Sequence, residues 1–240
     1  MMSSHPAETL QNTLGSELDG KVILHMITSS ISCFVAPMIS RELQRHGAKV
    51  IPVMTAEAAK FIDPLIFEWA TGIEPITAIE GKVEHVTYCG LSENKADLAL
   101  IAPITANSIS KIANGIMDNP VTLMAGTALG NKIPLIIVPT MHEVMMHNPA
   151  IIDNLAKLKQ MGVQVLMPRI EEEKAKIPEK REIVDHCIKK LYKNDLDGKK
   201  ILVTAGPTRA YIDNIRLLVI HQVERWVWHW HLRGGIEGQT

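Results

Sequence analysis

Short, mainly apolar segments that alternate with helical patterns constrain the fold more than any other feature of this chain. Residues 22–28 and 49–54 are two such segments, and the residues between them repeat apolar side chains at helical spacing. Strands without polar alternation are typical of parallel sheets that helices cover on both faces. The same order recurs around apolar segments at residues 98–103, 133–138 and 163–167. The sequence therefore predicts an α/β fold with a doubly wound parallel sheet.

The remaining segments predict four regions. Residues 1–19 are polar and are expected to form a loosely packed N-terminal arm. Residues 20–194 form the α/β domain, with a charged loop at 169–180 and a helix from Glu182 to Lys193. A polar break then precedes a new apolar strand at 199–204, so residues 195–216 are expected to begin a second α/β domain. Residues 217–240 form an aberrant tail.

Composition excludes several classes of protein. The 240 residues carry a net charge of −1, which gives no basic surface for nucleic acid or anionic membranes. The longest apolar runs are too short to span a bilayer. Three scattered cysteines without a C-x-x-C pair predict neither a disulfide framework nor zinc. No signal peptide is visible, and a cytoplasmic location is expected.

Small polar side chains follow the expected strands, where open α/β sheets bind their ligands. Ser29 and Ser30 lead directly into a helix, so they either favour an anion there or act as an ordinary N-cap. Thr55 follows the second strand. Thr105, Asn107 and Ser108 follow the third, where such residues either cap a helix or line a flat heterocycle. Neither the dinucleotide nor the P-loop glycine fingerprint is present.

Histidines offer two further candidates. One interpretation of His85 is a structural or solvent-exposed side chain. The other is that His85 accepts or donates a proton when a ligand lies close to it. His142, Glu143 and His147 have the spacing H-E-x-x-x-H, which places the two histidines on different helix faces. No metal site is therefore expected.

Taken together, the motifs resemble the flavoprotein half of the bifunctional phosphopantothenoylcysteine decarboxylase/phosphopantothenate–cysteine ligase family. This half belongs to the homo-oligomeric flavin-containing cysteine decarboxylases, and the resemblance covers residues 20–216. Ala102–Ser108 is similar to the family pattern A-P-A-T-A-N-T, and Leu202–Thr208 to the opening of the ligase domain. The matching stretches are Thr28–Ser32, Val53–Phe61, Glu84–Val86, Ala96–Asp97, Ala102–Ser108, Pro139–Met145 with Asn148–Pro149, Leu202–Thr208 and Ile212–Arg216.

The resemblance implies a Rossmann-like flavoprotein fold that binds FMN and decarboxylates 4′-phosphopantothenoylcysteine to 4′-phosphopantetheine in coenzyme A synthesis. It implies a homotrimer, or a dodecamer built from trimers, with the active site between protomers. His85 matches the catalytic histidine of the family. The FMN phosphate would be held by Ser29, Ser30 and Ile31 with Thr55, and the ribityl chain and ring by Thr105, Ala106, Asn107, Ser108 and Thr140.

Two departures from the family pattern concern the substrate. His142 stands where the family has the asparagine that contacts the substrate carboxylate, within the motif that also contains Met145. The family's substrate flap often has a cysteine that protonates the enethiol, whereas the matching stretch here offers only Lys174 and Lys176. Two alternatives stay open. One is a related FMN protein, such as a flavin prenyltransferase or an FMN-dependent reductase, although the ligase-like start argues against it. The other is a non-catalytic flavin-binding regulatory subunit.

The tail after Arg216 does not resemble the family. Three of the four tryptophans, Trp226, Trp228 and Trp230, lie within it. Read one base out of frame, the codons from Trp226 to His231 must encode Gly, Ala, Leu and Ala at the positions where the family has them. We therefore interpret the tail as the product of a one-base frameshift that truncates the ligase half. The alternative is a naturally divergent tail, and sequencing the gene distinguishes the two.

Overall fold

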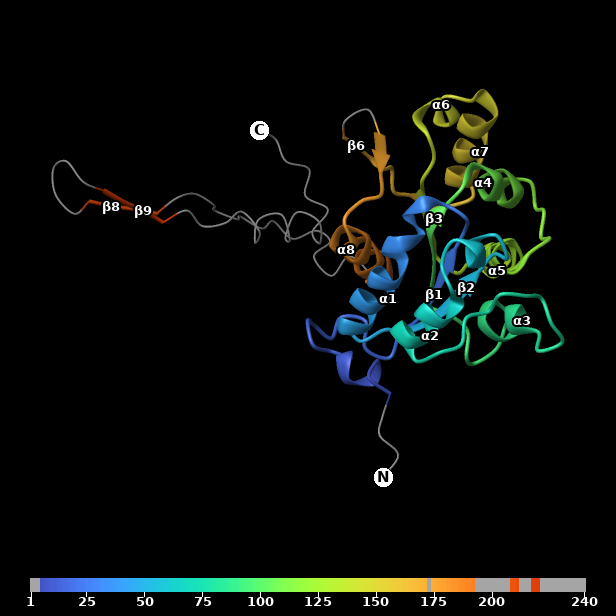
Figure 1. The fold of residues 1–240 in the computed structure, drawn as a ribbon, viewed down its shortest axis with the longest axis horizontal. Helices are drawn as coiled ribbons and strands as arrows, with labels where there is room; N and C mark the ends of the chain where they lie inside the picture. Colours follow the sequence, from blue (N-terminus) through green and yellow to red (C-terminus); the bar gives the residue numbers. More distant parts are fainter. Residues whose placement is uncertain (1–4, 172–173, 193–207, 212–216, 221–240) are drawn as a thin grey trace. The chain divides into compact units, whose positions relative to one another are not determined.

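A computed structural model of the chain describes residues 5–171, 174–192, 208–211 and 217–220 (Figure 1). The chain divides into two units, Met1–Leu191 and Tyr192–Thr240. The first unit contains the sheet and every helix that the structure describes. Among the described residues, none of the helices combines the length and the apolar character needed to cross a membrane.

Five parallel strands form the sheet of the first unit, in the order β2-β1-β3-β4-β5. All seven residues of β3 are buried, as are five of the six in β1 and in β2. This confirms the predicted doubly wound sheet, because strands at the centre of such a sheet meet helices on both faces. The strands are β1 (Val22–Ile27), β2 (Lys49–Met54), β3 (Leu98–Ile104), β4 (Leu135–Pro139) and β5 (Gln164–Val165).

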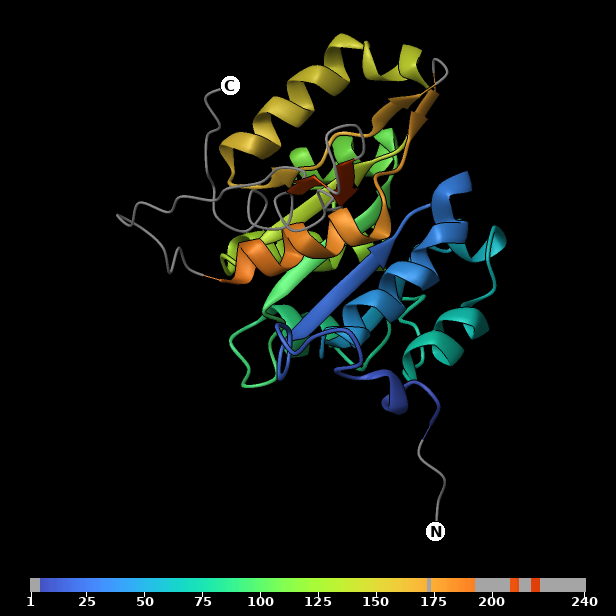
Figure 2. The ribbon, with the colours of Figure 1, turned by 90° about the vertical axis from the view of Figure 1, so that its left-hand side faces the viewer.

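Helices cover both faces of the sheet (Figures 1 and 2). On one face, α1 (Ala36–Arg45) and α8 (Lys180–Leu191) pack against a core that includes Ile23 and Leu98. On the other face, the core includes Leu24 and Ala99, so neighbouring residues of one strand point to opposite layers. The helices of this second face are α3 (Glu84–Cys89), α4 (Ala106–Ala113), α5 (Pro120–Gly130) and α7 (Pro149–Gln160).

Local sequence explains where several helices begin and end. The side chains of Asp63, Asn119 and Asn148 each accept a hydrogen bond from a backbone N–H of the first turn, and a proline follows each cap. Gly72 ends α2 (Pro64–Thr71) in the left-handed conformation that favours glycine. The short helices α2, α3 and α6 (Glu143–Met146) were not predicted, because they contain too few turns to produce a helical repeat.

The expectation of a loosely packed N-terminal arm is wrong for residues 5–19. Leu18 is fully buried in the core beneath α1, and a short 3₁₀ helix spans Glu8–Leu10. The backbone N–H groups of Leu14 and Leu18 donate to the carbonyl groups of Arg45 and His46. One buried leucine in a polar stretch does not produce a periodic pattern, so the sequence alone did not predict this packing.

The expectation of a charged loop at residues 169–180 is also wrong. Strands β6 (Arg169–Glu171) and β7 (Lys174–Lys176) pair antiparallel, and α8 begins at Lys180 rather than at residue 182. A three-residue strand is too short to be read from alternation of polar and apolar residues. The hairpin lies on the same side of the domain as α6 (Figures 1 and 2).

In the second unit, β8 (Thr208–Tyr211) pairs antiparallel with β9 (Leu217–Ile220). The strand predicted at 199–204 lies outside the described residues, as do most of the expected ligase start at 195–216 and of the tail at 217–240.

A fully buried histidine connects three elements of the first unit. His25 on β1 lies 2.9 Å from the carbonyl oxygen of Ala102 through Nε2, and 2.7 Å from the hydroxyl of Ser40 on α1 through Nδ1. Because a carbonyl group only accepts, Nε2 donates to Ala102 and Nδ1 accepts from Ser40. Burial lowers the pKa of His25 to about 4, although the bond to Ala102 opposes this effect.

We expect His25 to make the protein less stable in mild acid. The unfolded chain takes up a proton at this side chain as the pH falls below about 6.5, whereas the folded chain resists it until pH 4, so stability decreases across this window. The loss below pH 4 approaches about 3 kcal/mol. Urea unfolding at pH 4.5 and pH 7.5 measures it, with His25→Gln as the non-titrating control. A parallel loss of stability in the two proteins would contradict the assignment.

Candidate functional site

The carboxyl ends of β1, β2 and β3 surround a cavity of about 360 Å³. Because these strands are parallel and adjacent, the loops that follow them meet at one edge of the sheet. The cavity volume lies within the range of small-molecule sites. The lining residues are Thr28, Ser29, Thr55, Glu57, Thr105, Ala106, Asn107, Ser108, Lys111, Asp118, Asn119 and Met145.

The structure brings most of the predicted cofactor residues to this cavity. They are Ser29 after β1, Thr55 after β2, and the run from Thr105 to Ser108 after β3. Thr105 caps α4 by accepting a hydrogen bond from the backbone N–H of Ser108. Their position agrees with the prediction, while their role in binding stays a prediction.

The other three predicted cofactor residues lie next to these loops but do not line the cavity. The hydroxyl of Thr140, after β4, donates to the hydroxyl of Ser30 at 3.1 Å. Ser30 also accepts from the backbone N–H of Ser32 and thereby caps the 3₁₀ helix Ile31–Val35, which continues directly into α1. Ile31 is 70% exposed.

Buried hydrogen bonds fix the loop after β1 against β3. The hydroxyl of Thr28 donates to the carbonyl oxygen of Pro103 and accepts from the backbone N–H of Thr105 at 2.9 Å. Cys33 donates from its thiol to the carbonyl oxygen of Thr28. The backbone N–H groups of Ser29 and Ile31 donate to no residue within the described part of the chain. The loop therefore offers free donors from a rigid frame, which suits an anion.

His85 does not line this cavity. It lies on α3, which packs against α5 and is held at its last carbonyl groups by Asn131, whose side-chain amide donates to Cys89 and Gly90. Figure 1 places α3 away from α6 and from the start of α4. Within one copy of the chain, the predicted catalytic histidine and the predicted cofactor residues are therefore separate.

The predicted substrate residues are divided as well. Met145 on α6 lines the cavity, whereas His142 precedes α6 and is exposed outside it. Lys174 and Lys176 belong to β7, where they pair with Glu171 and Arg169 of β6. This pairing places both lysines on the flap hairpin.

No cysteine takes the place of the missing flap cysteine. Cys33, Cys89 and Cys187 are all buried and unpaired. Burial raises the pKa of all three thiols, to about 12 for Cys89. A buried thiol of this kind neither reaches a substrate nor gives up its proton at neutral pH.

Sequence reasoning missed five of the lining residues. Thr28 was read as part of the loop that leads into the first helix, but no cofactor contact was assigned to it. Lys111 lies four residues after Asn107 on α4, so the helical spacing would have placed it on the same face. Asp118 and Asn119 lie in the connection from α4 to α5, and Glu57 follows Thr55. Glu57 lies within the stretch Val53–Phe61 that matches the family, but no role was assigned to it, whereas Asp118 and Asn119 carry no sequence signal for the site.

Comparisons with known proteins agree with this geometry. The model of the flavoprotein family matches residues 11–192. Two bifunctional coenzyme A biosynthesis proteins, both named CoaBC, are 46% identical (Thermococcus kodakarensis, 89% of this chain and 53% of that protein) and 38% identical (Methanocaldococcus jannaschii, 89% and 52%). The chain thus spans about half the length of the curated relatives it matches.

Solved structures of similar fold include an FMN-dependent cysteine decarboxylase, SpaF, with a TM-score of 0.62 and 26% identity over 72% of this chain and 95% of that chain. The epidermin biosynthesis protein EpiD from Staphylococcus aureus has a TM-score of 0.59 and 25% identity over 69% and 99%. The resemblance to the flavoprotein half of the bifunctional family is thereby confirmed.

Proposed function

The chain belongs to the flavoprotein family, and from this premise we propose that it is an FMN-dependent decarboxylase of 4′-phosphopantothenoylcysteine. Its product would be 4′-phosphopantetheine, in coenzyme A biosynthesis. The cavity at the carboxyl ends of β1 to β3 carries the proposal, since six of the nine predicted FMN residues line it. The names of the similar proteins, which include coenzyme A biosynthesis proteins and an FMN-dependent cysteine decarboxylase, support it.

The donors around the cavity fit FMN. Free backbone N–H groups at Ser29 and Ile31 and the hydroxyl groups of Ser29, Ser30 and Thr55 suit a phosphate. The amide of Asn107 and the hydroxyl of Thr105 suit the hydroxyl groups and heteroatoms of the rest of the cofactor. When bound, FMN supplies the reversible two-electron oxidation of the substrate that makes loss of carbon dioxide feasible.

The residues of the chain would bind, orient and exchange protons. An imidazole nitrogen of His85 would accept the proton of the substrate thiol. His142 would donate a hydrogen bond to the substrate carboxylate, and Met145 would provide an apolar contact in the cavity. The flap hairpin with Lys174 and Lys176 would cover the substrate and exclude water, because it lies on the same side as α6.

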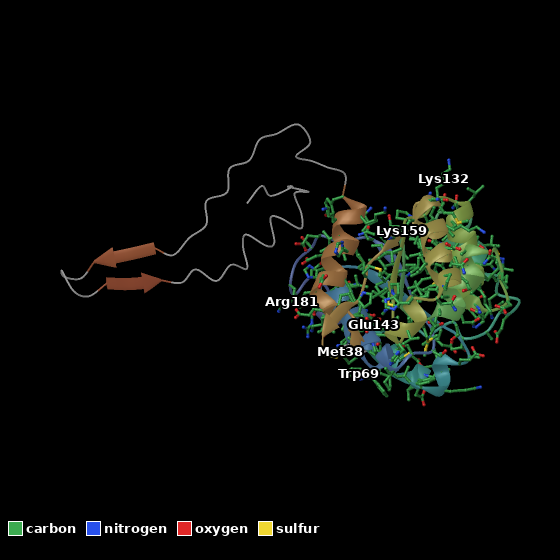
Figure 3. All side chains as sticks on the ribbon, turned by 90° about the horizontal axis from the view of Figure 1, so that it is seen from above. Met38, Trp69, Lys132, Glu143, Lys159 and Arg181 are labelled. Carbon is green, nitrogen blue, oxygen red and sulfur yellow. The ribbon has the colours of Figure 1, made fainter. Side chains whose placement is uncertain are left out.

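The distance between α3 and the cavity supports an oligomer in which His85 of one copy completes the site of the next. Two separate exposed apolar surfaces favour such a contact. The α1–α2 face consists of Ile31, Phe34, Met38, Leu65 and Trp69, each more than half exposed. Met38 and Trp69 lie on the same side of the domain (Figure 3).

The second surface, the α3 face, consists of the exposed residues Ile79, Val83, Val86 and Leu91, which lie on or next to α3, the helix that carries His85. Because Ile31 directly follows Ser29 and Ser30, a partner seated on the α1–α2 face would lie beside the cavity. A contact between two different faces repeats from copy to copy, and it closes into a ring when the rotation between neighbouring copies closes. We propose that this ring is the homotrimer, alone or assembled into a dodecamer, and that the protein acts in the cytoplasm.

FMN titration tests the cofactor assignment. We expect the purified protein to bind FMN with quenched flavin fluorescence, and Asn107→Trp to weaken binding at least about tenfold because the indole would fill the cavity. Gln160→Trp, on the exposed end of α7, is the matched control and should bind as the wild type does. A wild-type protein that binds no FMN would refute the proposed function.

Release of carbon dioxide from 4′-phosphopantothenoylcysteine tests the reaction itself. A protein that holds FMN but releases none from this substrate would be a flavin-binding protein of another function.

A further inference from the structure

Lys111 is the only positively charged side chain that lines the cavity among the residues described. It lies on α4, one helical turn beyond Asn107, so the two side chains share a face of the helix. The side chain of Lys111 is only 24% exposed, although it is a lysine near the end of a short helix. The stem of Lys111 is therefore largely covered, while its ammonium group forms an exposed ion pair at the wall of the cavity.

A carboxylate fixes the position of this ammonium group. Lys111 Nζ lies 2.6 Å from Asp118 Oδ2. The hydrogen bond and charge of Lys111 hold the pKa of Asp118 below its usual range. The other oxygen of Asp118 accepts from the side-chain amide of Asn119 at 3.0 Å, and Asn119 in turn caps α5. Asp118 is thereby anchored to α5 while it holds the lysine of α4.

Lys111 would lie closer to the ring of bound FMN than to its phosphate. The predicted phosphate contacts follow β1 and β2, whereas Lys111 follows Asn107 along α4, which leads away from the end of β3. Glu57, the remaining charged residue of the lining, follows β2, two strands across the sheet from β3. The cation of the Lys111–Asp118 ion pair is therefore at the α4 side of the cavity.

We propose that Lys111, positioned by Asp118, stabilises the reduced, anionic form of the FMN ring. This inference rests on the proposed binding of FMN. Two-electron reduction adds negative charge to the flavin ring, and a fixed cation close to the ring stabilises the reduced form more than the neutral oxidised form. Because Asp118 holds the ammonium group in advance, the cavity does not have to reorganise when the charge develops.

Binding of oxidised and of photoreduced FMN, measured without oxygen, tests the inference. We expect Lys111→Met to weaken the binding of reduced FMN about tenfold more than that of oxidised FMN, whereas Lys111→Arg should keep the ratio within about threefold of wild type. Asp118→Asn breaks the same ion pair but keeps the ammonium group. It should weaken the binding of reduced FMN by less than about threefold, because the ammonium group loses its fixed position but the negative charge of Asp118 is lost from the cavity lining as well.

An ion pair that merely clamps the α4–α5 connection predicts another pattern. Lys111→Met and Asp118→Asn would then lower the thermal midpoint equally, and neither would change the ratio of the two affinities. That result, or an equal change of the ratio in both variants, would overturn the inference. A wild-type protein without affinity for FMN would instead refute the proposed function, so the two failures are distinguishable. Far-ultraviolet circular dichroism checks that each variant is folded.

Discussion

Replacing His85 with asparagine is expected to lower the rate of decarboxylation by about 10²- to 10⁴-fold, the range that positioned proton transfer contributes. Asparagine preserves much of the volume and hydrogen-bonding capacity of histidine, but it neither accepts nor releases a proton at neutral pH. Because His85 does not line the cavity of its own copy, its replacement should leave FMN affinity within about threefold of wild type.

Steady-state release of carbon dioxide and FMN titration on the same preparations measure both halves of this prediction. His46→Asn is a suitable control, since His46 pairs with Glu17 and takes no part in the cavity. If His85→Asn kept more than about a tenth of wild-type turnover, His85 would not be the proton acceptor, because a positioned acid or base contributes more. A loss of FMN together with the activity would instead assign His85 a structural role.

The second large effect is expected when two inactive variants share one oligomer. His85→Asn lacks the proton acceptor, and Asn107→Trp lacks the cavity. If each site combines the cavity of one copy with His85 of the next, a random equal mixture has about a quarter of its sites built from two intact halves. Activity should therefore rise from near zero in either variant to about a quarter of the wild-type value.

Co-expression of the two variants under different affinity tags, followed by purification on both tags, provides the mixed oligomers. Because this step removes trimers of a single variant, about a third of the sites in the remaining mixed trimers combine two intact halves, and their activity should be about a third of the wild-type value. Mixing the separately purified variants without exchange of subunits is the control and should stay inactive. If His85 served the cavity of its own copy, every copy in the mixture would carry one defect. Mixed oligomers without activity would thus contradict the shared site while leaving the prediction for His85→Asn intact.

The sequence predicted the sheet because its information is local. A wholly apolar segment such as residues 98–103 is stable where both of its faces are buried, which is the centre of a parallel sheet covered by helices. Strand β3 lies at this position. The loops of the site were predicted for the same reason, since strand order brings Ser29, Thr55 and Thr105 to one edge. The fold, and the part of the site formed by the loops after β1, β2 and β3, could therefore be predicted from the periodicity of apolar residues and the direction of the strands.

The rest depends on contacts between distant parts of the chain. Asp118 reaches the cavity only because the α4–α5 connection returns to it, and Leu18 is buried only because α1 lies above it. The separation of His85 from the cavity depends on how α3 packs against α5. Such contacts produce no periodic pattern in the sequence, because the residues that form them are far apart in the chain or are single apolar residues in a polar stretch.

The buried position of Leu18 sets a practical boundary for work on the protein. A shortened version that starts at the first strand would remove this leucine, together with the backbone bonds to Arg45 and His46. It would leave an opening beneath α1, where Ile39 and Leu43 now meet the leucine. Expression tags are better placed ahead of residue 5 than in place of the residues that precede β1. The first strand is therefore a poor guide to where this domain begins.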